Sequence, residues 1–116
     1  MRIYIAAPLS DKDKTDRNPS KVVTDYIQNL HRMCKIASGV RKKGHAPYIP
    51  GVDFLVGVIA GDWEEDDYRD TSLEFLLVCD AILVAGKSWG VMQETKVAKK
   101  AGLAVFYSLE EIPKVL

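Results

Sequence analysis

The chain has 116 residues, of which 47% are apolar and 28% charged, and its 16 basic side chains balance its 16 acidic ones. This length suffices for one hydrophobic core, so we expect a single domain over residues 1–116. The zero net charge gives no electrostatic reason to expect binding to nucleic acid or to an anionic membrane. No apolar run resembles a signal peptide or approaches the roughly 20 residues of a spanning helix.

The two cysteines, Cys34 and Cys79, stand far apart in apolar surroundings. We interpret them as free, buried thiols of a cytoplasmic protein rather than as a disulfide or a metal-binding pair. The chain has only two histidines, and they form no cluster with the spacing of metal ligands. We therefore expect no bound metal ion.

Strand and helix patterns alternate along the first half of the chain. Residues 2–8, "RIYIAAP", form a short β-favouring run that predicts a strand buried on both faces. The polar segment that follows predicts a loop, and Ser20 is the expected N-cap of a helix that runs to about Lys43. Residues 45–50, "HAPYIP", predict a brief second strand.

The second half continues the alternation after an unusual connection. Residues 51–64 are apolar and dotted with glycines but have no clean period, so we expect a loop that packs over a pocket or against a second subunit. Residues 65–78 predict a helix, and "DAILVAG" at 80–86 predicts a buried strand. A helix over 91–101 and a last strand over 103–108 follow.

This alternation predicts an α/β fold, a Rossmann-like parallel sheet of about four strands with helices on both faces. In such sheets ligands bind beyond the carboxyl ends of the strands, so residues 7–19, 50–64 and 86–91 matter most. The glycine-rich dinucleotide fingerprint and the P-loop pattern are both absent. We therefore expect no nicotinamide or flavin cofactor.

The stretch "SWGVMQE", residues 88–94, lies where the buried strand passes into a helix. A helix N-terminus has unpaired N–H groups and a partial positive charge, which favour an anion such as phosphate. Gly90 lets the backbone approach a ligand, Ser88 adds a hydroxyl donor, and Lys87 adds charge. The alternative is a simple helix start, with Ser88 or Gly90 as the N-cap.

Glu94 lies one turn into the same helix. It is either a solvent-facing acid that complements the helix dipole or a carboxylate held near the anion site. A ribose 5′-phosphate would place its electrophilic anomeric carbon at about this offset from the phosphate. Attack there by a carboxylate would give a covalent glycosyl-enzyme, as in retaining glycosidases.

The ordered motifs "IYIAAP", "LEFLLVCDAILVAG", "SWGVMQE" and "AKKAG" resemble those of the nucleoside 2-deoxyribosyltransferase superfamily, over Ile3 to about Ser108. That superfamily includes transferases that exchange bases between deoxynucleosides and hydrolases that split nucleoside 5′-monophosphates. The resemblance implies a domain of this kind, with Glu94 as the nucleophile and Tyr4 orienting it. Members that act on 5′-monophosphates tend to carry a serine two residues before the glycine, and Ser88 occupies that position here.

The resemblance also implies a second acidic catalytic residue at the start of the helix before the "DAILVAG" strand. An ungapped alignment places Ser72 there, with Asp67 and Asp70 nearby. We take Asp70 as the candidate, and the alternative is that these acids form only a solvated first turn. Further ligand contacts are expected from residues after the first strand and at the strand–helix junction, namely Ala7, Ser10, Ser88, Gly90 and Val91.

Together these observations lead us to expect an N-glycosidase that cleaves the base–sugar bond of a nucleoside or deoxynucleoside 5′-monophosphate. A second base would take the sugar where transfer outcompetes hydrolysis, and no metal or organic cofactor is needed. The alternative is a non-catalytic nucleotide-binding protein of the same fold. We also expect a homo-oligomer, because the sheet is small, the segment "VDFLVGVIAG" is apolar, and members of the superfamily assemble their sites at dimer interfaces.

Overall fold

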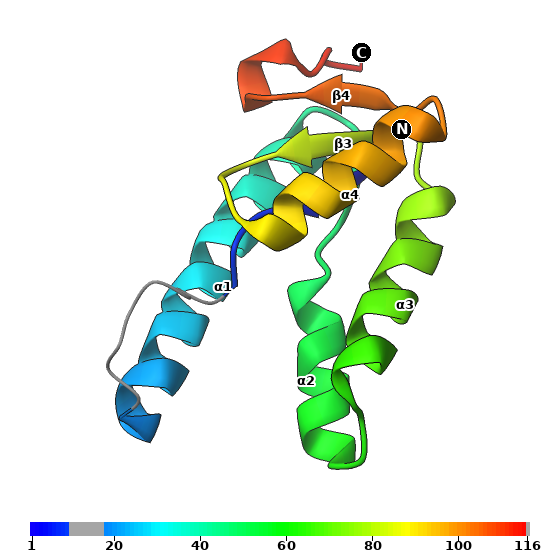
Figure 1. The fold of residues 1–116 in the computed structure, drawn as a ribbon. Coiled ribbons are helices and arrows are strands. Elements are labelled where there is room, and N and C mark those ends of the chain that lie inside the picture. Colours follow the sequence, from blue (N-terminus) through cyan, green and yellow to red (C-terminus); the bar gives the residue numbers. More distant parts are fainter. Residues whose placement is uncertain (10–17, 116) are drawn as a thin grey trace.

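The computed structural model of the protein describes residues 1–9 and 18–115. The elements in chain order are β1 (Arg2–Ala6), α1 (Pro19–Lys42), β2 (Ala46–Tyr48), α2 (Gly51–Ala60), α3 (Glu65–Leu77), β3 (Ala81–Val84), α4 (Trp89–Lys100), β4 (Ala104–Phe106) and the 3₁₀ turn η1 (Leu109–Glu111). The strands pair in parallel in the order β2-β1-β3-β4 (Figure 1). The predicted α/β, Rossmann-like fold is confirmed.

The central strand β1 divides the hydrophobic core into two clusters. Successive side chains of a strand point to opposite faces of the sheet. Ile3 and Ile5 pack on the face covered by α1, whereas Tyr4 and Ala6 pack on the face covered by α3 and α4. All four side chains are completely buried, as the sequence predicted for a strand covered on both faces. Helices α4 and α1 lie in front of and behind the sheet in Figure 1.

The N-cap of helix α1 lies two residues earlier than predicted. The side chain of Asn18 accepts a hydrogen bond from the Ser20 N–H at 3.0 Å, and Pro19 occupies the first helical position. Proline suits that position because its missing N–H would have no partner there. Asn18, rather than Ser20, is therefore the N-cap. The helix ends before Gly44, as predicted, and Gly44 has a φ of 93°.

Both cysteines are free thiols, but Cys34 is exposed, contrary to the prediction that it is buried. The residues that α1 turns toward the sheet are Met33, Ala37 and Val40. Cys34 follows Met33 directly, about 100° further round the helix, and so faces away from this contact. Cys79 is half-buried, and its thiol donates to the carbonyl oxygen of Phe75 at 3.3 Å.

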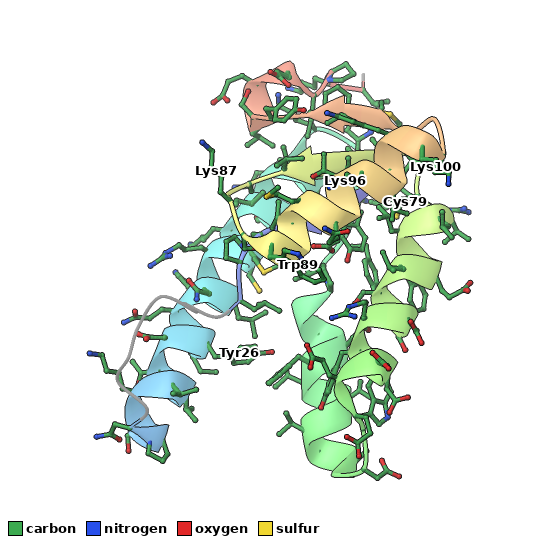
Figure 2. The ribbon with its side chains drawn as sticks, in the orientation of Figure 1. Tyr26, Cys79, Lys87, Trp89, Lys96 and Lys100 are labelled. Atoms are coloured by element: carbon green, nitrogen blue, oxygen red, sulfur yellow. The ribbon has the colours of Figure 1, made fainter. Side chains whose placement is uncertain are left out.

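Helix α2 replaces the loop that was predicted for residues 51–64. Gly57 lies inside this helix and does not interrupt it. The Tyr68 ring of α3 packs where a side chain at position 57 would lie, since a Cβ atom at Gly57 would be 2.3 Å from that ring. At the other end Tyr26 reaches from α1 to donate to the Gly51 carbonyl at 2.7 Å (Figure 2). Gly61, with a φ of 80°, ends the helix. Helix α2 is thus held from two sides.

Helix α2 was missed because its large apolar residues do not gather on one buried face. Six of them are between 37% and 82% exposed, namely Val52, Phe54, Leu55, Val56, Val58 and Ile59. Amphipathic periodicity appears only where one face of a helix is buried and the opposite face is polar. Over residues 1–9 and 18–115, neither α2 nor any other helix is both long and apolar enough to cross a membrane.

The segment after β4 is anchored to the end of α1 instead of extending as a plain tail. The ammonium group of Lys43 donates to the carbonyl oxygens of Leu109 and Ile112, at 2.6 and 2.8 Å. Ile112 is 1% exposed and completes the α1 side of the core. This end of the molecule lies at the edge of the sheet away from α2 and α3 (Figure 1).

Candidate active site

A cavity of about 880 Å³ opens where the carboxyl ends of the strands meet the helices. All three predicted segments contribute to its wall, and α1, α3 and residues 92–94 of α4 add the rest. Its lining residues are Ala7, Pro8, Leu9, Asn29, Arg32, Pro50, Asp53, Phe54, Tyr68, Arg69, Ser72, Leu73 and Lys87 to Glu94. The cavity therefore lies at the edge of the sheet where parallel α/β proteins bind ligands.

Tyr4 and Glu94, predicted as partners, meet beside this cavity. The fully buried Tyr4 of β1 donates its hydroxyl hydrogen to the Oε2 atom of Glu94. Glu94 is half-buried, one turn into α4, and lines the cavity. It is therefore not the solvent-facing acid of the alternative interpretation. The strand fixes the hydroxyl group, and the hydroxyl group in turn fixes the orientation of the carboxylate.

Burial raises the pKa of Glu94 from 4.5 to about 7, because the charged form loses solvation. The hydrogen bond from Tyr4 favours the charged form and offsets part of this effect. The pKa of Tyr4 is raised as well, first by burial and then by the nearby charge of Glu94. Tyr4 therefore remains a neutral donor near neutral pH, while Glu94 changes its charge there.

Ser88 is the N-cap of α4, as the helix-start interpretation predicted. Its Oγ atom accepts a hydrogen bond from the Val91 N–H at 3.1 Å, which leaves the hydroxyl hydrogen available as a donor. The Val91 N–H is thereby occupied, although Val91 itself lines the cavity. The N–H groups of Trp89 and Gly90 lie in the first turn, where a helix supplies no acceptor, so these two amides are the ones suited to an anion.

Gly90 is not explained by the packing of the protein. A Cβ atom at this position would meet only the Ser88 Oγ, at an ordinary contact distance of 3.8 Å, and the φ angle is not positive. Glycine in a helix costs about 1 kcal/mol relative to alanine. No contact within the protein compensates for this cost at Gly90. The absence of a side chain, however, leaves the first turn of α4 bare toward the cavity.

Among the residues that the structure describes, three cationic side chains border the cavity. The Arg69 guanidinium lies 5.2 Å from the ring centre of Trp89, which ties α3 to the start of α4. Arg32 donates to Asn29, whose amide donates to the Leu9 carbonyl at 3.0 Å, so α1 holds the end of the segment after β1. Lys87 lines the cavity from the loop, although its side chain extends away from α2 and α3 (Figure 2).

The acidic residues of α3 do not lie where the family resemblance required one. Asp70 is exposed and is not among the residues that line the cavity. The Asp67 carboxylate accepts from the Glu64 N–H at 2.7 Å, within a capping box at the start of α3. Ser72 is the α3 residue that lines the cavity near Tyr4, and its side chain lowers the pKa of Tyr4 in part.

The cavity nevertheless contains a second carboxylate, Asp53, which the sequence analysis did not identify. It lies in the first turn of α2 and accepts a hydrogen bond from the hydroxyl group of Tyr48 in β2. An acidic residue three positions after Pro50 is typical of a helix start, and that signal was available in the sequence. It was overlooked because residues 51–64 were predicted to be a loop.

The remaining predicted positions have different outcomes. Ala7 lines the cavity just beyond the end of β1. Ser10 lies outside the described residues. Within residues 1–9 and 18–115, no three histidine, cysteine, aspartate or glutamate side chains gather closely enough to hold a metal ion.

The fold and the cavity define a Rossmann-like α/β protein with two tyrosine-held carboxylates at the carboxyl edge of its sheet. Comparison with known proteins adds no identity to this description. No protein-family model and no curated protein sequence matches the chain. The class of the protein therefore rests on its fold and on the geometry of its cavity.

The raised pKa of Glu94 predicts how stability depends on pH. The native state holds a proton on Glu94 up to about pH 7, whereas the unfolded chain releases it near 4.5, so the native state loses stability as the pH rises through this window. Glu94→Gln removes this loss. We expect the variant to be more stable than the parent by about 1 to 3 kcal/mol at pH 8 and equally stable near pH 4. Denaturant unfolding at both values measures this, and a difference independent of pH would contradict it.

Proposed function

We propose that the protein is an N-glycosidase that cleaves the base–sugar bond of a nucleoside or deoxynucleoside 5′-monophosphate. The single observation that carries the proposal is the hydrogen-bonded pair of Tyr4 and Glu94, which faces a cavity at the N-terminus of α4. The cavity is large enough for a nucleotide, since pockets for small molecules are typically 300–1,000 Å³. The motif order that resembles the nucleoside 2-deoxyribosyltransferase superfamily supports the same reaction.

In the proposed reaction, the ionised Glu94 attacks the anomeric carbon while the bond from that carbon to the base breaks. The electron pair of the broken bond leaves with the base, which takes up a proton from solvent, and the sugar phosphate becomes an ester of Glu94. Water then attacks the same carbon, gives up one proton to solvent, and releases the sugar phosphate and the Glu94 carboxylate. Tyr4 holds the carboxylate in position throughout. A second base in place of water would give base transfer.

The start of α4 is the proposed phosphate site. The Ser88 hydroxyl and the N–H groups of Trp89 and Gly90 are donors grouped at the positive end of the helix dipole. Arg32 and Arg69 line the same cavity and bring positive charge to it, although Arg69 also pairs with Glu65 and Asp66 on α3. An aspartate in place of Ser88 would repel the phosphate, so the serine supports a phosphorylated substrate over a free nucleoside.

A binding protein without turnover is the second candidate. It is favoured by one specific observation: the cavity face of α3 presents Ser72, while Asp70 is exposed outside the cavity. If an acid on α3 were required for departure of the base, the protein would bind nucleotides and release none. In that case nucleotides would raise the melting temperature without any appearance of free base.

Release of free base from a panel of nucleoside and deoxynucleoside 5′-monophosphates tests the N-glycosidase proposal. We expect kcat/KM to rise with pH and to reach half its maximum near pH 7, because only the ionised Glu94 attacks. Glu94→Gln should lower the rate by about a thousandfold or more. Tyr4→Phe should move the midpoint to higher pH, because it removes the hydrogen bond that lowers the Glu94 pKa. Unchanged release by Glu94→Gln would refute the proposal, and Asp62→Asn, at an exposed acid outside the cavity, is the matched control.

Gly90→Ala tests the phosphate site separately from the chemistry. The added methyl group meets open space in the protein, so stability should be unchanged or higher by up to about 1 kcal/mol. It would narrow the approach of a phosphate, so we expect the Kd for a nucleoside 5′-monophosphate to rise at least tenfold and the Kd for the free nucleoside to change little. Calorimetric titration measures both constants. Equal weakening of the two ligands would contradict a phosphate site at this turn.

The proposed assembly is a homo-oligomer formed through α2. Six large apolar side chains of this ten-residue helix are exposed, and exposed apolar surface concentrated in this way marks interaction sites. A second copy of the chain fits this surface, because the exposed helix carries one charged residue, Asp53, and the whole chain has no net charge to oppose self-association. Since α2 also lines the cavity, association would bring a second subunit close to the ligand.

Light scattering tests this assembly at micromolar concentration, where we expect a mass of at least twice the 12.9 kDa of one chain. Ile59→Lys places a charge at the most exposed apolar position of α2, 82% exposed, and should shift the protein toward the monomer. Tyr107→Lys is the matched control, since Tyr107 is also exposed and directly follows β4. Strand β4 lies at the opposite end of the molecule from α2 (Figure 1). A monomeric parent protein would contradict the proposal.

A further inference from the structure

The sheet presents two tyrosine–carboxylate pairs side by side. Tyr4 of β1 and Tyr48 of β2 are partners in the parallel register, and their ring centres lie 5.5 Å apart. Tyr4 donates to Glu94 from α4, and Tyr48 donates to Asp53 from α2. The reaction above uses the first pair and gives no role to the second, although both carboxylates line the same cavity.

Asp53 is available to a ligand. Burial and the hydrogen bond to Asp53 both raise the pKa of Tyr48, so the tyrosine stays a donor and Asp53 stays the acceptor. Over residues 1–9 and 18–115, Tyr48 is the one hydrogen-bond partner of the Asp53 side chain, and no cation lies within ion-pair distance of it. One carboxylate oxygen is thereby oriented by β2, while the other is left for a donor in the cavity. An ionised carboxylate accepts hydrogen bonds and donates none.

The order of the strands defines the direction in which a nucleotide would lie. Helix α4 starts just beyond β3, Glu94 is held over β1, and Asp53 is held over β2, which is the spatial order β3-β1-β2. Neighbouring strands lie about 4.8 Å apart. A phosphate at the start of α4 and an anomeric carbon at Glu94 therefore direct the base toward Asp53.

The wall around Asp53 suits a planar base. Phe54 and Tyr68 line the cavity with stacked rings whose centres are 5.4 Å apart, and Pro50 and Leu9 add apolar surface. Apolar and aromatic walls with a few oriented polar groups are characteristic of small-molecule sites, and the polar groups set specificity.

Resting on the proposed function, we propose that Asp53, oriented by Tyr48, determines which base is accepted and selects bases that present an amino group. An amino group donates hydrogen bonds to the carboxylate. An oxo group at the same position is an acceptor, so it would face the carboxylate oxygen without forming a hydrogen bond. A site built to bind an N–H group discriminates strongly against an analogue without it, because the polar group of the site is then left unpaired. Asp53 is thus a specificity residue rather than the missing acid of the reaction.

Matched pairs of 5′-monophosphates test this selection: cytidine against uridine, and adenosine against inosine, which differ by an amino or an oxo group at one ring position. We expect the parent protein to prefer one of the two amino-base substrates. For that substrate, kcat/KM should exceed the value for its oxo partner at least tenfold. Asp53→Asn keeps the size of the side chain and can both donate and accept, so the ratio should fall at least fivefold. Asp62→Asn, at an exposed acid between α2 and α3 that does not line the cavity, should leave the ratio unchanged.

Calorimetric Kd values for the same pairs keep this test independent of turnover. If the parent releases no base but binds the amino member more tightly, and Asp53→Asn removes that preference, the N-glycosidase proposal fails while the selection by Asp53 stands. A parent without preference in either assay overturns the selection. An equal loss of affinity or kcat/KM for both members in Asp53→Asn also overturns the selection, because a structural role or a contact with the sugar would weaken both members alike.

Discussion

The hydrogen bond from Tyr4 to Glu94 is the interaction on which the geometry of the cavity depends. It joins the central strand to a helix 90 residues later in the chain, so it exists only when β1 and β3 pair in register and α4 packs across them. A shift of β1 by one residue would turn Tyr4 toward α1 and bring Ile3 or Ile5 to the cavity side. The core on both faces prevents this shift, because it would place the tyrosine among the aliphatic residues around Met33.

Much of the fold was predictable because its strands and most of its helices follow strong local patterns. The short apolar runs of β1 and β3 predicted a sheet buried on both faces, and Gly44 and Gly102 ended helices where positive φ angles are found. Helix α2 was not predictable in this way. Its apolar residues lie mainly on the exposed side, and Gly57, which a sequence pattern presents as a breaker, is the position at which Tyr68 packs.

The cavity was predictable where its residues follow one strand–helix junction and unpredictable where it depends on packing between helices. Ser88, Gly90 and Glu94 lie within seven residues, so the pitch of one helix fixes their relation. Asp70 and Asp53 cannot be distinguished in this way. The rotation of α3 about its axis and the packing of α2 against it determine which acid reaches the cavity. The local sequence predicts neither the rotation nor the packing. In the structure, Asp53 accepts a hydrogen bond from Tyr48 and lines the cavity.

Two features of α4 reduce the stability of the protein, and they lie within about one turn of each other. Gly90 weakens the helix without relieving any contact, and Glu94 holds a carboxyl group where burial opposes its charge. Selection for folding alone would favour alanine at the first position and an uncharged residue at the second. Local departures from the rules of stable folding are concentrated at functional sites, where a ligand or a reaction gives them a use. Because both departures face one cavity, the proposed nucleotide would account for both: its phosphate would need the bare turn, and its anomeric carbon would need a carboxylate that water solvates poorly.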